Sequence, residues 1–242
     1  MKTLTKLIIV LLLMLSMVTS AQEVKNSTSG FLDFNIYPWL SDVDGDSVFT
    51  LNIGATIANS FSYFSLTNFS NQADRGAVEE TSNYYTEQNI RWQLPNAPAF
   101  DLTAQLNLRS GMDNDRLRLG MRWRLQDSDF LREFFQTISL QWSINLHAIQ
   151  IDHSDDNVWQ LEHVFKLGFP SLSNRLYLAG FIDHTFGETL PDGFPSSPIV
   201  GEAQLGYRIV ENLYGVLEYR INQYRRSDVN NLAAGIEYKI KW

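Results

Sequence analysis

Four arginines alternate with apolar residues along the segment 116–125, which reads RLRLGMRWRL. In an extended chain, successive side chains point to opposite faces, so Arg116, Arg118, Arg122 and Arg124 share one face and the apolar side chains share the other. Arginine stays protonated in proteins and presents a planar set of donors that suits anions. This face therefore predicts anion pairing, either with carboxylates of the protein or with a solute.

A second set of charges lies near the carboxyl terminus and combines both signs on one predicted face. In the last segment, Glu237 and Lys239 alternate with Tyr238, Ile240 and Trp242. Two preceding segments place further acids and a base on the same kind of face. The predicted ion pairs are Glu202 with Arg220, Arg220 with Glu237, and Glu218 with Lys239. We expect this set to hold the wall of the fold together.

The elements that position these residues are short alternating segments separated by turn-forming residues. Twelve segments are predicted as strands: 31–39, 47–57, 60–70, 83–94, 99–109, 115–125, 137–149, 157–169, 174–186, 198–210, 212–224 and 229–242. The connections alternate between tight turns and longer, often acidic loops. The tight side has one exception at 127–136, where four apolar residues suggest an amphipathic helical turn. An even number of strands, with short turns at one end and long loops at the other, is typical of a closed antiparallel transmembrane β-barrel.

The amino terminus and the composition favour lipid outside this barrel over a soluble sandwich. Lys2 and Lys6 precede an apolar run from Leu7 to Val18, which is too short for a membrane-spanning helix and is typical of a signal peptide. We expect residues 1–21 to be cleaved, residues 22–30 to form a flexible lead-in, and residues 31–242 to form the barrel. There is no cysteine for a disulfide or a lipid anchor. The predicted location is a bacterial outer membrane.

In such a barrel the polar faces line the lumen. We expect the following residues to line the path of a solute: Arg109, Arg116, Arg118, Arg122, Arg124, Glu87, Arg91, Tyr85 and Asp183. A hairpin around 110–114 sets Asp101 against Arg124, Thr103 against Arg122, Asn107 against Arg118, and Arg109 against Arg116. Only the first of these pairs is neutral. The other arginines then need more distant acids, such as Glu87, Asp33 and Glu162, or a passing anion.

A second interpretation of the lumen depends on aromatic side chains. Tyr63, Tyr85, Tyr177 and Phe181 are predicted to point inward, where they could stack a nucleobase with Glu87 or Asp183 as acceptor. The arginines favour small anions instead.

Other function classes find little support. Without residues 1–21, the chain has 17 basic and 27 acidic residues, a formal charge of −10, which argues against a nucleic-acid partner. Asp42, Asp44 and Asp46 lack the glycine and glutamate positions of a calcium loop, so no metal or cofactor is expected. For catalysis, His153-Ser154 is the one adjacent candidate pair, and neighbours in a chain usually point apart.

Three resemblances follow from particular segments. The end GIEYKI followed by Trp242 resembles the carboxy-terminal signal that the barrel-assembly machinery recognises, although that signal more often ends in phenylalanine. Residues 62–69 and 84–92 resemble early strands of the nucleoside-specific channel-forming (Tsx-like) family. The arginine segment, which follows LRSG at 108–111, resembles small twelve-stranded porins for acidic oligosaccharides. These resemblances imply an outer-membrane channel whose lumen is lined by arginine or by aromatic residues.

The sequence therefore predicts a passive, narrow channel for small polar or anionic solutes. Its expected surroundings are outer-membrane lipid and lipopolysaccharide. The alternatives are a barrel enzyme that acts on lipids and a plugged barrel without a transport role.

Overall fold

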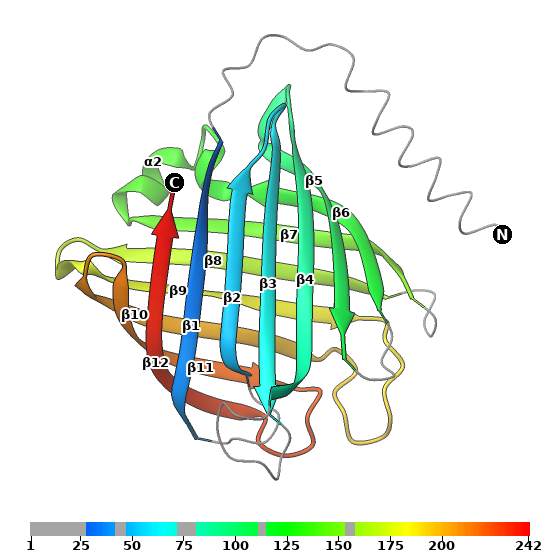
Figure 1. The fold of residues 1–242 in the computed structure, drawn as a ribbon. Coiled ribbons are helices and arrows are strands. Elements are labelled where there is room, and N and C mark those ends of the chain that lie inside the picture. Colours follow the sequence, from blue (N-terminus) through cyan, green and yellow to red (C-terminus); the bar gives the residue numbers. More distant parts are fainter. Residues whose placement is uncertain (1–27, 42–46, 72–80, 111–114, 153–157) are drawn as a thin grey trace.

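The computed structural model describes residues 28–41, 47–71, 81–110, 115–152 and 158–242. These residues form one closed antiparallel barrel in which each strand pairs with its neighbours in sequence and β1 closes on β12 (Figure 1). The strands are β1 (Ser29–Leu40), β2 (Ser47–Thr56), β3 (Phe61–Asn71), β4 (Thr81–Leu94), β5 (Ala97–Arg109), β6 (Arg116–Arg124), β7 (Leu140–Ile151), β8 (Trp159–Phe169), β9 (Ser173–Phe186), β10 (Ile199–Val210), β11 (Leu213–Asn222) and β12 (Asn230–Lys241). The predicted twelve-stranded barrel is confirmed.

The two ends of the barrel differ in the length of their connections. Figure 1 shows the start of β1, the end of β12 and the short helix α2 (Arg132–Thr137) at one end, which we call the turn end. Here Asn59 and Asn212 take left-handed φ angles of 61° and 67°, as tight hairpin turns require. The predicted helical turn at 127–136 corresponds to η3 (Leu125–Asp127) and α2. The opposite end, the loop end, carries the longer connections.

The outer surface of the barrel is apolar and its interior is polar. Ile90, Leu217 and Ile236 are 52%, 48% and 50% exposed on the outside, whereas Gln105 and Glu237 are each 1% exposed within the lumen. A water-soluble protein has the reverse arrangement. Because barrel closure also pairs every strand edge, this surface suits a hydrocarbon environment. The structure thus has the surface of a membrane-spanning protein.

No helix in the described residues is long and apolar enough to cross a membrane.

Strand β3 faces the opposite way from our prediction. Asn68 lies opposite Thr50 of β2, and Leu66 lies opposite Glu87 of β4. Paired residues point to the same side of a sheet. Phe64 and Leu66 of β3 pair with lumenal residues of β4 and therefore point inward, whereas Tyr63 points outward. The prediction that Tyr63 points into the lumen is wrong. Strand β3 carries no charge, so its own residues gave little indication of which face meets lipid.

The predicted register of β5 and β6 is wrong by two residues, although both strands keep their predicted faces. Asp101 lies opposite Arg122 rather than Arg124, and Gln105 lies opposite Arg118. The prediction places the hairpin turn around 110–114. In the structure, the Arg109 amide donates to the Asp115 carboxylate at 3.4 Å, on the loop side of Arg116. The shift places a carboxylate and an amide against two arginines.

The closing strands confirm one of the three predicted pairs. Glu202 lies opposite Arg220. Arg220 lies opposite Asn231 rather than Glu237, and Glu218 lies opposite Ala233 rather than Lys239, so these two predictions are wrong. The cause is the position of the hairpin between β11 and β12, which closes where the Asn222 amide donates to the Val229 carbonyl at 2.8 Å.

The lipid-facing assignment predicts a depth-dependent effect of an added charge. Ile236 lies in the middle of β12, and Ile240 lies at its turn end. We expect Ile236→Arg to lower the free energy of unfolding by about 2–4 kcal/mol and the matched control Ile240→Arg by about 0–1 kcal/mol, because a cation costs most at the bilayer midplane. Urea unfolding in lipid vesicles measures both values. Equal losses at the two positions would contradict the assignment.

Candidate functional site

The lumen contains two cavities stacked along the barrel. The loop-side cavity has a volume of about 450 Å³ and extends to Glu188 and Tyr224, which follow β9 and β11. The turn-side cavity has a volume of about 490 Å³ and extends to Gln126 of η3 and to Lys239 near the end of β12. Together they reach from one end of the barrel toward the other.

The two cavities share four apolar side chains, which we call the apolar waist: Phe64 and Leu66 of β3, Val164 of β8 and Phe181 of β9. In a ring of twelve strands, β3 lies across the lumen from β8 and β9. Side chains that line both cavities lie at the level where the cavities meet. Glu202 also lines both cavities, and on β10 it is the direct neighbour of Phe181. The waist is therefore an apolar level in an otherwise polar lumen, with one carboxylate beside it.

Arg118 faces the loop-side cavity from a wall of amides. Its Nε donates to the Gln150 oxygen at 2.8 Å, and its Nη1 donates to the Gln105 oxygen at 3.0 Å. The side chain of Arg118 is buried, with an exposure of 4%. Neutral amides hold the guanidinium in position without cancelling its charge. Arg118 is thus a fixed positive group beside the cavity.

Tyr85 connects a carboxylate and a second arginine on the same wall. Its hydroxyl donates to Glu87 at 2.5 Å and accepts from the Asn107 amide at 2.8 Å. The Arg109 guanidinium lies 5.2 Å from the centre of the Tyr85 ring, within the range of a cation–π interaction. One face of this ring is therefore covered by Arg109.

Arg116 is neutralised at the loop end. Its guanidinium contacts Glu188 at 2.7 Å and Asp152 at 3.8 Å. The Tyr224 hydroxyl also donates to Glu188. Burial, together with this hydrogen bond, raises the pKa of Tyr224 to about 12, so the hydroxyl stays protonated and remains a donor. Arg116 anchors the connection after β9 rather than presenting an open charge.

Two carboxylates lie directly opposite each other on β8 and β9. Glu162 is the cross-strand partner of Asp183. Glu162 accepts from the Asn145 amide, and it lies 3.3 Å from the His147 ring nitrogen Nε2. The Oδ1 oxygen of Asp183 has no hydrogen-bond partner among the described residues. Because this oxygen is unpaired and Asp183 lines the loop-side cavity, it is an acceptor available to a solute or to water there.

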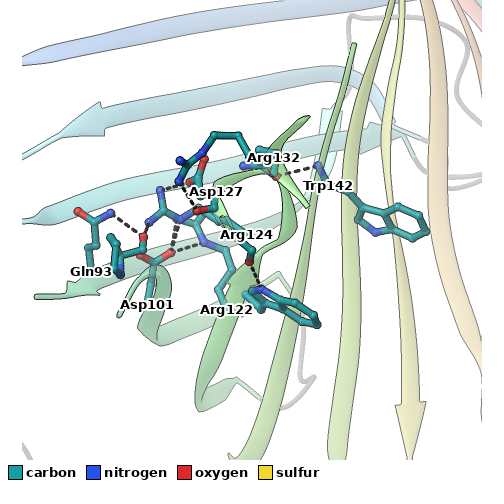
Figure 2. A network of polar contacts seen from close by, with 11 residues as sticks. Gln93, Asp101, Arg122, Arg124, Asp127, Arg132 and Trp142 are labelled. Atoms are coloured by element: carbon teal, nitrogen blue, oxygen red, sulfur yellow. Dashed lines mark hydrogen bonds and ion pairs between the residues drawn. The ribbon is translucent and has the colours of Figure 1, made fainter. Parts of the chain in front are cut away.

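Asp101 binds two arginines at the turn end of the lumen. Figure 2 shows its carboxylate between the guanidinium groups of Arg122 and Arg124, at 2.6 Å and 3.3 Å. Arg124 also contacts Asp127 at 2.7 Å, and Arg132 donates to the Asp127 carbonyl at 3.0 Å. These contacts connect the barrel wall to η3 and α2. They also neutralise the two arginines that line the turn-side cavity.

The closing strands contain two polar clusters that Gln204 connects: its oxygen accepts from the Tyr37 hydroxyl at 3.2 Å, and its amide nitrogen donates to Glu237 at 3.4 Å. In the first, Arg220 contacts Glu218 at 2.6 Å, and Glu218 accepts from the Tyr37 hydroxyl at 2.7 Å. In the second, Lys239 contacts Glu237, and it lies 3.4 Å from Asp33. Each cation here pairs along its own strand or with the neighbouring wall. The predicted network exists as polar contacts, with partners that differ from those predicted.

The structure brings most of the predicted path residues to the cavities. The loop-side cavity is lined by Arg109, Arg116, Arg118, Glu87, Tyr85 and Asp183. Arg122 and Arg124 line the turn-side cavity. Arg91 lines neither cavity and lies 5.5 Å from the centre of the Phe64 ring. The acids that neutralise the arginine face are Asp101, Asp127, Asp152 and Glu188, whereas Asp33 contacts Lys239 and Glu162 contacts His147.

Sequence reasoning missed three of the four waist residues, namely Phe64, Leu66 and Val164. Val164 was detectable in principle, because it interrupts a polar series with Glu162 and Lys166 on one face of β8. Several predictions concern residues outside the described ranges: the signal peptide at 1–21, the acidic loop with Asp42, Asp44 and Asp46, and the His153-Ser154 pair.

No protein-family model and no curated protein matches the chain. The solved structures that match the chain include two porins. The NanC porin has a TM-score of 0.52 and is 9% identical, over 88% of this chain and 100% of that chain. The KdgM porin has a TM-score of 0.49 and is 14% identical, over 87% of this chain and 98% of that chain. The chain thus shares the barrel fold of an outer-membrane porin.

Proposed function

We propose that this protein is a narrow, passive outer-membrane channel for small polar solutes, including anions. The observation that carries this proposal is the pair of lumenal cavities that meet at the apolar waist. Small twelve-stranded barrels lie between those filled by side chains and those with wide aqueous channels. Two cavities of about 450 and 490 Å³ that share lining residues are what a narrow path through such a lumen requires.

The charges along this path favour weak rather than strong ion selectivity. Among the described residues, the loop-side cavity is lined by five arginines and five carboxylates. Arg116 is paired with acids, whereas Arg118 is held by neutral amides. Arg118 therefore offers an anion its most direct contact, and Asp183 offers an acceptor to hydroxyl or amino groups. Solutes with both kinds of group, such as acidic sugars or nucleosides, match this arrangement.

Aromatic stacking is the weaker of the two path hypotheses. Tyr85 and Phe181 line the loop-side cavity, and Tyr177 lines the turn-side cavity. Arg109 covers one face of Tyr85, and Tyr63 lies on the outer surface. A nucleobase would therefore meet fewer open rings than the sequence suggested.

Solute flux through pure protein tests the proposal. We expect liposomes containing the protein to swell in solutions of small sugars and not in solutions of larger oligosaccharides. In planar bilayers we expect small, steady conductance steps. Absence of both signals in folded protein would favour the plugged barrel. Release of fatty acid from phospholipid would favour the enzyme, whose predicted His153-Ser154 pair lies outside the described residues.

The proposed location implies further partners. The apolar outer surface would contact membrane lipid, and the loop end would face lipopolysaccharide. The carboxy-terminal strand β12 would be recognised by the barrel-assembly machinery during insertion.

A further inference from the structure

The outer surface of β3 and β4 carries a cluster of polar side chains where lipid contact is expected. We call Tyr63, Ser65, Thr67, Thr86 and Gln88 the polar patch; Ser65 is buried at 2% exposure, whereas the other four are partly exposed. Their outward direction follows from the register. Tyr63 lies opposite Ile90, which is 52% exposed, and Gln88 lies opposite Leu106, which is 39% exposed on the outer surface of β5.

Hydrogen bonds join most members of the polar patch to one another. The Tyr63 hydroxyl donates to the Gln88 oxygen, and the Gln88 amide donates to Thr86 Oγ1 at 2.6 Å. Thr86 Oγ1 and Thr67 Oγ1 lie 2.8 Å apart. Since the Gln88 amide nitrogen carries two hydrogens, one of them is left over after its bond to Thr86. The patch therefore offers hydrogen-bonding capacity beyond its internal contacts.

The polar patch lies at the depth of the hydrocarbon core. Toward the loop end it is followed by the pair Phe69 and Tyr84, and toward the turn end by the pair Phe61 and Trp92. Aromatic rows of this kind mark the two interfaces of a membrane barrel. Eight residues separate Tyr84 from Trp92, which is about 27 Å along a strand, or about 20 Å of depth at a tilt of about 40°.

The remaining described strands lack a comparable patch. Between the aromatic rows, their outward positions carry aliphatic, aromatic, methionine or glycine residues, with His163 and His184 as the exceptions. These two histidines lie on the opposite side of the barrel and contact aromatic rings, His163 at Trp142 and His184 at Phe186. The patch is thus a local property of β3 and β4.

The depth of the patch limits which molecule can cover it. Acyl chains offer no hydrogen-bond partner, so exposed polar groups at this depth are unfavourable. Headgroups and water-soluble proteins lie beyond the aromatic rows. A second membrane-spanning protein reaches this depth, and small or hydroxyl-bearing residues are typical of such contacts between membrane segments.

We infer that the polar patch is the contact surface of a homodimer in the membrane. A two-fold axis along the membrane normal brings the same patch of two copies together, so the leftover Gln88 donor of one copy meets the hydroxyl oxygens of the other. Ala55, opposite Tyr63, and Ala104, opposite Ile90, leave room for close approach at the edges of the patch. This inference depends on the barrel spanning a membrane and not on conduction.

Cysteine cross-linking tests the inference directly, because the chain has no cysteine of its own. We compare Ala104→Cys, at the edge of the patch, with the matched control Ile182→Cys. Ala104 lies opposite Ile90, which lies opposite Tyr63 beside Phe64, and Ile182 is 43% exposed on the outside of β9 beside Phe181, so the two positions lie at the depth of the waist. With a short bis-maleimide in liposomes at low protein density, we expect severalfold more dimer from Ala104→Cys than from Ile182→Cys.

A second variant separates a specific contact from random collision. Thr86→Val with Gln88→Leu makes the patch apolar, and Thr67→Cys then reports on proximity. We expect severalfold less cross-linked dimer than from Thr67→Cys alone, with unchanged barrel folding by heat-modifiable migration. Equal cross-linking at positions 104 and 182, no dimer from either, or heterodimers between the two variants would overturn the two-fold contact. Cross-linking in cells to a different protein, without a dimer in liposomes, would overturn it as well.

Discussion

A barrel in which Phe64 and Phe181 are both replaced by alanine is expected to conduct severalfold more current per channel than the wild type. The two rings come from β3 and β9 on opposite sides of the lumen, at the level where the cavities meet. An apolar constriction limits ions because water leaves it readily. Alanine removes the bulk of both rings while leaving the charged walls in place. Single-channel recording in symmetrical potassium chloride measures the change.

The matched control for this variant is Phe69→Ala. Phe69 lies on β3 as Phe64 does, but it points outward and contacts Phe49 with a ring-centre distance of 5.6 Å. Replacing a buried phenylalanine costs about 3–5 kcal/mol, and both waist rings are partly open to the lumen, so the barrel should still fold. An unchanged conductance in a folded double variant would place the narrowest level elsewhere in the lumen.

The sequence predicts the barrel well where charge marks the face of a strand. On β6, four arginines alternate with leucine, methionine and tryptophan, so both faces are unambiguous and the structure agrees. The strand bounds follow because turn-forming residues and acidic loops separate the alternating segments. An even number of strands is typical of a closed barrel, and the pairing of β1 with β12 closes it in the structure.

Strand β3 shows where prediction from sequence fails. Its segment FSYFSLTNFSN has hydroxyl or aromatic residues on both faces and no charge. Its direction is set by β4, whose Glu87 and Arg91 belong in the lumen, and that information lies some 20 residues away in the chain. Because the predicted faces of β3 are exchanged, the sequence did not predict that Phe64 and Leu66 line the waist or that Tyr63 belongs to an outward polar patch.

Registers also depend on features that local alternation does not contain. A shift of two residues leaves every side chain on its own face, so alternation cannot distinguish Arg122 from Arg124 as the partner of Asp101. The loop geometry decides between them. Alternation likewise does not show that Arg220 contacts Glu218 of its own strand, or that Lys239 contacts Glu237 of its own strand and Asp33 of β1.

The Asp101→Asn variant is expected to move the channel toward chloride selectivity. Asp101 is 2% exposed and is the carboxylate that contacts Arg122, at 2.6 Å. Arg124 keeps its contact with Asp127, so Arg122 is left with its charge uncompensated beside the turn-side cavity. Two opposite unit charges 4 Å apart attract each other by about 4 kcal/mol at an effective dielectric constant of 20, against about 1 kcal/mol in water. The uncompensated Arg122 should therefore stabilise a passing anion at this level of the lumen more than it does in the wild type.

The measurement is the reversal potential in a potassium chloride gradient, with Asp129→Asn as the charge-matched control. The Asp129 side chain is 94% exposed beside α2, where water screens it, so its loss should shift the potential severalfold less. Adding Arg122→Gln to Asp101→Asn restores the net charge and should return selectivity toward the wild type. Breaking a buried ion pair costs about 3–5 kcal/mol, but the Arg122 side chain is 17% exposed to the lumen, which reduces the cost. Equal shifts for Asp101→Asn and Asp129→Asn would mean that ions do not pass Arg122.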